Sequence, residues 1–288
     1  FHCDVNPFSG HEVLFQDLKS KAARAKTVWI AGGGPGGMTA AITAAERGHT
    51  VTLWEKSGQL GGNLIPAGAH DFKAELNELN AWYQTQLDTL GVAVQRNHPA
   101  TAQAIQEAHP DAVILAVGAT PTVPPVAGMD SPKVVDCVTA LTGADLPGQR
   151  ILVVGGGLVG CETALGYAQA GKTVTIVEAL PDILSAGIPV PEMNASMLRD
   201  LLAEWKVTLR TGCRLAQVTA EGAVVTGPQG EETLPADHVV LAVGFTPRPS
   251  LAGELAGTGM EVYQVGDGSK VGSVMTAIAS AYTVARAL

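Results

Sequence analysis

The segment Val28-Trp-Ile-Ala-Gly-Gly-Gly-Pro-Gly-Gly37 decides the fold of this chain, because it returns as Ile151-Leu-Val-Val-Gly-Gly-Gly-Leu-Val-Gly160. In both copies an acid, Glu55 or Glu178, lies 23 residues after the first glycine of the spaced set. This pattern is typical of a buried strand that turns into a helix whose free N–H groups face a pyrophosphate, with the acid closing the next strand. Two copies in one chain therefore predict two dinucleotide-binding units.

The spaced glycines have different tasks. The first makes the sharp turn, the second lets a phosphate approach bare backbone, and the third lets the helix pack closely against its strand. The acid accepts hydrogen bonds from a ribose diol. Two unrelated glycine-rich turns would not also repeat the strand, the helix and the acid. In the order first, second, third, the glycines are Gly32, Gly34 and Gly37 in one copy and Gly155, Gly157 and Gly160 in the other.

Length and charge narrow the possible functions. At 288 residues the chain has room for two ordinary domains. Its net charge of −9 argues against a nucleic-acid partner and against attraction to anionic lipid. Two uncharged stretches, residues 27–45 and 112–129, are long enough to raise the question of a membrane span, but clustered glycines or prolines interrupt both. We expect no transmembrane segment.

The cysteines indicate a reducing compartment. They lie far apart and suggest no disulfide framework. No charged-then-apolar leader opens the sequence, so we expect no signal peptide and a cytoplasmic location. The histidines form no metal-ligand spacing with the cysteines. The four cysteines are Cys3, Cys137, Cys161 and Cys213.

A second repeat reinforces the first. The stretch Asp111-Ala-Val-Ile-Leu-Ala-Val-Gly-Ala-Thr-Pro121 is echoed by Asp237-His-Val-Val-Leu-Ala-Val-Gly-Phe-Thr-Pro247, with eight of eleven positions identical. Each reads as a short buried strand that ends at a glycine, Gly118 or Gly244. We expect each to be a later parallel strand of the sheet that its own glycine-rich segment begins.

The order of these repeats predicts an α/β fold with two Rossmann-like dinucleotide-binding domains, the second inserted in the first. After an irregular lead-in at residues 1–24, residues 25–145 and 246–288 would form one domain and residues 146–245 the other.

Periodicity predicts the remaining elements. Residues 69–90 and 190–206 read as helices, residues 207–241 as short strands, and residues 274–288 as an alanine-rich helix. In the first helix, five apolar side chains are spaced for one buried face: Phe72, Leu76, Leu79, Trp82 and Leu87.

The chain resembles a known group of enzymes. The nested fingerprints, with Leu60-Gly61-Gly62 and Val265-Gly266-Asp267, look like the FAD- and NAD-binding half of flavin disulfide-reductase-like enzymes. More narrowly, Cys3-Asp-Val-Asn-Pro7 combined with Gly157-Leu-Val-Gly-Cys-Glu-Thr-Ala164 resembles the C-terminal half of the 2,4-dienoyl-CoA reductase and trimethylamine dehydrogenase branch of the old yellow enzyme family. The match covers essentially the whole chain.

The resemblance implies a route for electrons. In that family an FMN-bearing barrel comes first, four cysteines then hold a four-iron cluster, and electrons pass from NAD(P)H to FAD, the cluster, FMN and the substrate. Cys3 matches the last of those four ligands. One thiolate cannot hold a cluster, so Cys3 would be a ligand only together with an upstream polypeptide or partner. The chain would then be the electron-input part, as a fragment or a subunit.

The resemblance also assigns residues to cofactors. The first fingerprint would hold FAD, with Glu55 at its adenosine ribose and Asp267 at its ribityl or pyrophosphate region. The second would hold the nicotinamide nucleotide. The residues placed at the cofactors are Gly32, Gly34, Pro35, Gly37, Glu55, Lys56, Gly61, Gly62, Asn63, Gly118, Gly155, Gly157, Leu158, Gly160, Glu178, Gly244, Gly266, Asp267 and Ala277.

Glu178 bears on the choice between NADH and NADPH. A carboxylate accepts the 2′-hydroxyl of NADH but repels a 2′-phosphate. No Lys or Arg follows Glu178 before Arg199, so the sequence favours NADH unless an arginine arrives from elsewhere in the fold.

We therefore expect hydride transfer from C4 of NADH to N5 of FAD, which needs no side-chain acid or base, and we name no catalytic residue. Disulfide reductases of this fold place a redox cysteine pair after the acid, yet no cysteine lies between Glu55 and Ala69. We expect Cys161 to be a packing residue. Two alternatives stay open: a non-catalytic nucleotide-binding module, and a stand-alone NADH oxidase or diaphorase.

Overall fold

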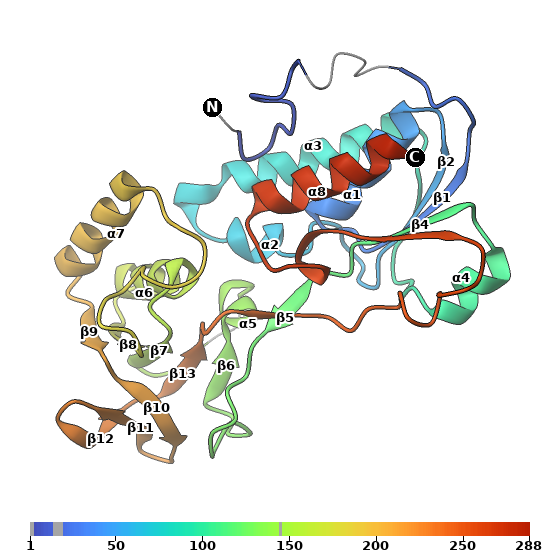
Figure 1. Ribbon diagram of the computed structural model, residues 1–288. Coiled ribbons are helices and arrows are strands. Elements are labelled where there is room, and N and C mark those ends of the chain that lie inside the picture. The colour runs from blue at the N-terminus through green and yellow to red at the C-terminus, as the bar shows by residue number, and fades with distance from the viewer. Residues whose placement is uncertain (1–2, 14–19, 144–145) are drawn as a thin grey trace. The chain divides into compact units, whose positions relative to one another are not determined.

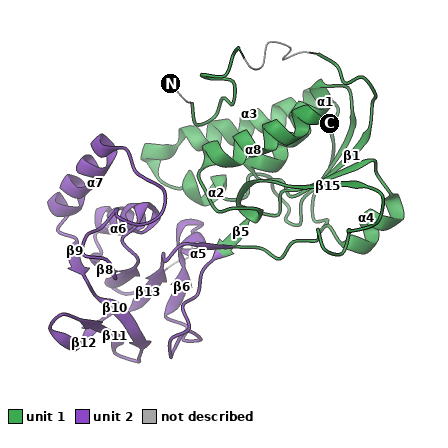
Figure 2. Cartoon of the chain, in the orientation of Figure 1, with its two compact units in different colours: residues 1–120, 247–288 green, residues 121–246 purple. Residues whose placement is uncertain are grey.

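The computed structural model describes residues 3–13, 20–143 and 146–288, and it divides the chain into two compact units. Unit 1 comprises residues 1–120 and 247–288, and unit 2 comprises residues 121–246 (Figure 2). Each unit is built on a parallel sheet with helices on its faces, which is the predicted α/β, Rossmann-like fold.

The sheet of unit 1 has five parallel strands in the order β15-β4-β1-β2-β3. Its central strands are short apolar runs, and all four residues of β4 are buried, as expected where helices cover both faces. The strands are β1 (Thr27–Ala31), β2 (Thr50–Trp54), β3 (Ala93–Gln95), β4 (Ala112–Leu115) and β15 (Glu261–Gln264).

Three helices cover one face of this sheet, and Figure 1 shows them side by side. They are α1 (Pro35–Glu46), α3 (Glu75–Thr89) and α8 (Val274–Ala287). Small residues of α1 are buried between the strands and α8, which lets the backbones approach closely. The other face packs against α4 (Ala102–Ala108) and Leu255. Three short helices complete the unit: α2 (Leu64–Ala67), η1 (Asp71–Lys73) and η2 (Gly266–Gly268).

The predicted apolar face of residues 69–90 was partly wrong. Leu87 is buried, but Phe72 is 49% exposed and Trp82 is 51% exposed. The buried aromatic residue is Tyr83, one position further along α3, whose hydroxyl is hydrogen-bonded to that of Thr39 at 3.0 Å. The rotation of the helix therefore directs Tyr83, not Trp82, against α1.

Unit 2 repeats the architecture with the strand order β6-β13-β7-β8-β9, all parallel. Its strands are β6 (Val134–Asp136), β7 (Arg150–Val154), β8 (Thr173–Glu178), β9 (Thr208–Thr211) and β13 (His238–Leu241). An antiparallel sheet adds β10 (Arg214–Val218), β11 (Gly222–Gly227) and β12 (Gly230–Pro235). The helices are α5 (Cys137–Leu141), α6 (Leu158–Gln169) and α7 (Glu192–Glu204).

The chain leaves unit 1 earlier than the sequence suggested. Unit 1 stops at Thr120, whereas we expected a crossing near residue 145; residues 144–145 themselves lie outside the described part. The reason is that β6 pairs with β13 and α5 packs against α6, so both belong to the second sheet.

Two short strands pair with each other where the chain leaves unit 1 and where it returns. They are β5 (Ala119–Pro121) and β14 (Phe245–Pro247). Within unit 1, the N–H of Arg248 donates to the carbonyl of Gly118 at 3.0 Å. Within unit 2, the N–H of Thr122 donates to the carbonyl of Gly244 at 2.9 Å. Each unit therefore holds its own two chain ends together.

The lead-in forms no helix or strand over residues 3–13 and 20–26. The ring of Phe8 packs edge-on against that of Tyr282 in α8, with centroids 4.7 Å apart. The N–H of Ala22 donates to the carbonyl of Arg47 at the end of α1. Both described pieces are thus attached to unit 1. Within the described residues, no helix combines the length and apolar character needed to cross a bilayer.

Candidate functional site

The first glycine-rich loop has a backbone that only glycine can form. Gly32 adopts φ +113°, and a Cβ there would stand 2.3 Å from the carbonyl oxygen of Ala116. A Cβ on Gly37 would lie 1.8 Å from the carbonyl oxygen of Gly32. The first glycine thus makes the turn and the third brings α1 against the loop, as the sequence predicted.

The second loop, in unit 2, has the same geometry. Gly155 adopts φ +107°, and a Cβ there would stand 2.4 Å from the carbonyl oxygen of Ala242. A Cβ on Gly160 would lie 1.9 Å from the carbonyl oxygen of Gly155. Gly244 follows two residues after Ala242 at the end of β13, with φ +97°. The structural equivalence of the two copies therefore extends to individual backbone atoms.

The two acids hold these loops directly. Oε2 of Glu55 accepts a hydrogen bond from the N–H of Gly33 at 2.8 Å, and Oε2 of Glu178 accepts one from the N–H of Gly156 at 2.6 Å. Both side chains are buried, at 8% and 7% exposed. A carboxylate has about four acceptor positions, so each acid can still receive ribose hydroxyls. The sequence predicted the nucleotide contact but not this bond to the middle glycine.

The second glycine of each set begins a helix. Gly34 precedes α1 and Gly157 precedes α6, and neither helix start has a side-chain cap, so free N–H groups face outward. A Cβ on Gly34 would have its nearest neighbour at 4.0 Å, and one on Gly157 would meet nothing within 4 Å. These glycines thus open space beside the positive end of a helix dipole, where an anion binds favourably.

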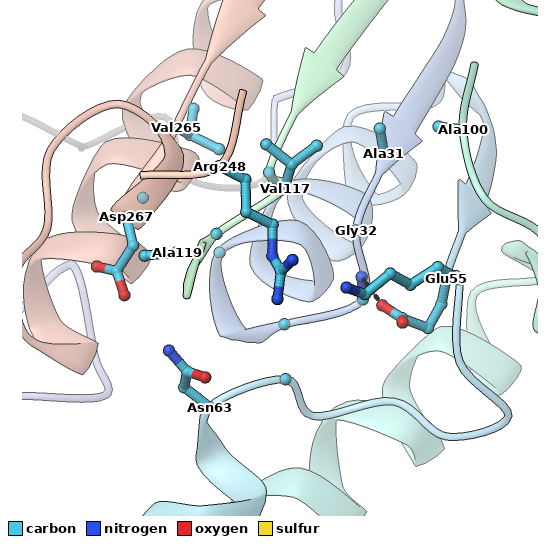
Figure 3. A pocket seen from close by; sticks show the side chains of 18 of the residues that line it. Ala31, Gly32, Glu55, Asn63, Ala100, Val117, Ala119, Arg248, Val265 and Asp267 are labelled. Atoms are coloured by element: carbon cyan, nitrogen blue, oxygen red, sulfur yellow. Dashed lines mark hydrogen bonds between the residues drawn. The ribbon is translucent and has the colours of Figure 1, made fainter. Parts of the chain in front are cut away.

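A cavity of about 390 Å³ lies over the first loop, entirely within unit 1 (Figure 3). Its size is within the range usual for small-molecule and cofactor sites. Gly37 and Gly61 are not among the lining residues: Gly37 packs against the loop, and the N–H of Gly61 donates to the carbonyl of Gly33. The predicted residues that line the cavity are Gly32, Gly34, Pro35, Glu55, Lys56, Gly62, Asn63, Gly118, Gly266, Asp267 and Ala277.

Asp267 supplies a partly buried carboxyl group to one end of this cavity. Burial raises the pKa of Asp267, while the N–H of Gly272, bonded to Oδ1 at 3.0 Å, and the side chain of Asn63 favour the charged form. Figure 3 shows Asp267 and Asn63 at the same end of the cavity. This part of the site therefore offers polar groups in a partly desolvated setting, suited to ligand hydroxyls.

The sequence reasoning missed Arg248. Its side chain reaches into the cavity toward Gly32 and Glu55 (Figure 3). Among the described residues its guanidinium has no hydrogen-bond or ion-pair partner. One signal was present: Arg248 follows directly after the second Thr-Pro pair, where the chain returns to unit 1.

The buried cysteines are packing residues. Burial raises the pKa of Cys161 to about 12 and that of Cys137 to about 11, and Sγ of Cys161 donates to the carbonyl of Gly156. Cys213 is also buried, whereas Cys3 is partly exposed in the lead-in. No cluster of three or more His, Cys, Asp or Glu residues that could hold a metal ion occurs in the described ranges.

In unit 2, the predicted residues converge on the second loop. Gly155, Gly157 and Gly160 form it, and Glu178 joins it through Gly156. Leu158, the first residue of α6, is 36% exposed beside this loop.

Comparison with known proteins places these features in a family. A family model described as pyridine nucleotide-disulphide oxidoreductase matches residues 26–273. The cinnamate reductase of Clostridium sporogenes is 41% identical over 99% of this chain and 42% of its own length. The NADH oxidase of Thermoanaerobacter brockii is 36% identical over 98% of this chain and 44% of its own length. A solved 2-naphthoyl-CoA reductase complex superposes with a TM-score of 0.92 at 31% identity, over 100% of this chain and 43% of that one.

The chain therefore spans less than half the length of these relatives. The family model nevertheless covers both glycine-rich loops, both acids and the whole of unit 2. The chain belongs to the pyridine nucleotide-disulphide oxidoreductase family and is an FAD- and NAD(P)H-binding oxidoreductase module.

Proposed function

We propose that unit 1 holds FAD and that unit 2 holds NADH. The observation that carries this proposal is the equivalence of the two loops, each with its middle glycine bonded to a buried acid. When bound, FAD would supply N5 as the acceptor for the hydride carried by C4 of NADH. The side chains of this module bind and orient the two nucleotides and exclude water, and none is required as an acid or base.

The residues of unit 1 fit FAD. The start of α1, which has no side-chain cap, and the guanidinium of Arg248, which has no partner among the described residues, offer positive charge for a pyrophosphate. Glu55 would accept the adenosine ribose hydroxyls, and Asp267 with Asn63 would contact the ribityl chain at the other end of the cavity. The remaining lining glycines would keep Cβ atoms away from the ligand.

The residues of unit 2 favour NADH over NADPH. Glu178 is fixed by the N–H groups of Gly156 and Leu180, so its carboxylate cannot rotate away without losing both bonds. A 2′-phosphate at this position would meet a negative charge that is only 7% exposed. A 2′-hydroxyl would instead donate to it.

The onward route of the electrons follows from the finer resemblance. We infer that this module supplies electrons to an iron–sulfur and FMN half, as in the 2,4-dienoyl-CoA reductase and trimethylamine dehydrogenase branch. The relatives have more than half of their length outside the matched region, which is room for such a half. Cys3 would then be one of four cluster ligands, the others coming from that half, which also selects the final substrate. A reducing cytoplasm suits this chemistry.

An anaerobic titration tests the proposal. The purified chain is incubated with FAD, freed of excess, and titrated with NADH while the flavin absorbance is followed. Bleaching near equimolar NADH supports the proposal. Bound flavin that NADH does not bleach would make the chain a non-catalytic nucleotide-binding module. Absence of bound FAD after incubation would overturn the assignment of unit 1.

A second arm separates the module from a stand-alone oxidase. NADH turnover is compared with dissolved oxygen and with a one-electron dye as acceptor. The proposed module reduces the dye and uses oxygen slowly, whereas rapid sustained turnover with oxygen alone would favour the stand-alone oxidase. Cys3→Ser should leave dye reduction unchanged.

A further inference from the structure

An ion pair lies on the loop that follows β8, beside the second glycine-rich loop. Oδ2 of Asp182 and Nη2 of Arg199 are 2.5 Å apart, and the same nitrogen donates to the carbonyl of Ile183 at 2.8 Å. Arg199, the first basic residue after Glu178 in the sequence, belongs to α7. The fold brings its side chain next to Asp182 and Ile183, which follow shortly after Glu178. The arginine bond holds the pKa of Asp182 below its ordinary value, so the pair is charged at neutral pH.

Short contacts connect this pair to the nucleotide loop. The N–H of Leu184, next to Ile183, donates to the carbonyl of Gly156 at 2.7 Å. A Cβ on Gly156 would lie 2.8 Å from Cγ2 of Ile183 and 3.2 Å from Oε2 of Glu178. Ile183, whose carbonyl accepts the bond from Arg199, therefore packs directly against Gly156, the glycine bonded to Glu178.

Arg199 and Glu178 also affect the pKa of the same buried thiol, that of Cys161. Burial raises the pKa of the Cys161 thiol, Arg199 lowers it and Glu178 raises it, so both charges act on one buried group at the start of α6. Arg199 is partly exposed, with 37% of its side chain accessible, which leaves room for an anion to approach it.

The other cations of unit 2 are less well placed. Four of them lie just before, or at the first residue of, strands of the parallel sheet, at the edge opposite to the one proposed for nucleotide binding. Arg210 is paired with Glu232 at 3.1 Å, and Arg214 opens β10 of the antiparallel sheet. The four at strand starts are Lys133, Arg150, Lys172 and Lys206.

We propose that Asp182 is a second determinant of the choice of nucleotide, because it neutralises Arg199, the cation best placed to bind a 2′-phosphate. This inference rests on the proposed binding of NADH in unit 2. Glu178 repels the phosphate directly, while Asp182 occupies the guanidinium that would otherwise attract it. Arginine binds phosphate through paired N–H groups, so an Arg199 released from Asp182 would be free to bind a 2′-phosphate.

Calorimetry with two matched ligands, ADP-ribose and 2′-phospho-ADP-ribose, tests the inference on the purified chain. Wild type should bind ADP-ribose more tightly. Asp182→Asn should tighten 2′-phospho-ADP-ribose about fivefold, the scale of an exposed charge interaction, and leave ADP-ribose unchanged. Asp182→Asn combined with Arg199→Gln should return to the wild-type ratio. Asp182→Ser provides a second variant if the asparagine form does not fold.

Arg214→Gln in the Asp182→Asn background is the matched control, because it removes one cation from the same unit and should preserve the gain. The inference is overturned if Asp182→Asn leaves the ratio of the two affinities unchanged, or if its gain survives Arg199→Gln. Failure of the wild type to bind ADP-ribose at all would instead overturn the proposed role of unit 2. Rates of flavin reduction by NADPH and NADH should shift in the same ratio as the affinities.

Discussion

The carboxylate of Glu178 accepts a 2.6 Å hydrogen bond from the N–H of Gly156, so the acid that we propose as the ribose acceptor also fixes the second glycine-rich loop. Glu178→Gln should therefore weaken both binding and folding, because an amide cannot accept at both of its termini. Hydrogen bonds to a charged group contribute about 1.5–3 kcal/mol, so the affinity for ADP-ribose should fall roughly 10–100-fold. Calorimetry measures the affinity and thermal melting the stability. Glu204→Gln removes an exposed charge from α7 and should leave both unchanged.

We expect two glycines of the second loop to have different roles, Gly160 in folding and Gly157 in binding. In Gly160→Ala the new Cβ meets the carbonyl oxygen of Gly155, and overpacking of this kind costs about 1–3 kcal/mol. In Gly157→Ala the Cβ meets nothing, so stability should change by less than about 1 kcal/mol while the space for a phosphate is lost. Melting temperatures and ADP-ribose affinities check both variants. Equal melting temperatures for the two would contradict this division of roles.

Arg248 should contribute to the binding of FAD through its charge. Arg248→Gln is expected to weaken FAD binding roughly 10-fold or more, since an arginine–phosphate contact is a charge-assisted bond. Titration of the apo chain with FAD at low and high salt measures the effect, and the wild type should show the steeper salt dependence. Arg24, whose side chain is 83% exposed, provides the control Arg24→Gln. An unchanged affinity in Arg248→Gln at low salt would exclude a role for this side chain.

The cysteines should differ in reactivity. With its pKa raised by burial to about 12, the Cys161 thiol is ionised in only about one molecule in 10⁴ at pH 8, and thiols react as thiolates. Brief alkylation at pH 8 should therefore label Cys3 and spare Cys161 and Cys137, as mass spectrometry of the peptides would show. Rapid labelling of Cys161 in the folded chain would contradict its assignment as a packing residue.

Two aspartates should make stability depend on acid pH. The carboxylate of Asp237 accepts hydrogen bonds from the side chain of Arg150 and from the N–H groups of Gln149 and Arg150, and these bonds hold its pKa below the ordinary value. The carboxylate of Asp111 likewise accepts hydrogen bonds from the N–H and the hydroxyl of Thr27, and these bonds hold its pKa below the ordinary value. Because both folded pKa values are depressed, their stabilisation is fully present above pH of about 4 and is lost as the pH falls through the folded values. Asp237→Asn should lower the melting temperature at pH 7 by a few degrees and flatten its decline toward pH 3.

The sequence predicted the features that depend on backbone geometry. Gly32, Gly155 and the two acids were found because a tight strand–turn–helix leaves few alternatives in residue type and spacing. The sequence did not predict Arg248 or the placement of Arg199, because a long flexible side chain reaches its site from a residue far along the chain. Trp82 was misplaced for a related reason: neighbouring aromatic residues on a helix compete for one buried position, and packing decides between them.

The two hydrogen bonds at the passages between units have a consequence for protein engineering. Gly118 and Arg248 close the gap in unit 1, and Thr122 and Gly244 close the ends of unit 2. Termini that are already adjacent add little loop-closure entropy when a segment is exchanged. Residues 121–246 are therefore a cassette: substituting the equivalent segment of a relative that uses a different nucleotide should change the nucleotide bound there, while unit 1 stays folded.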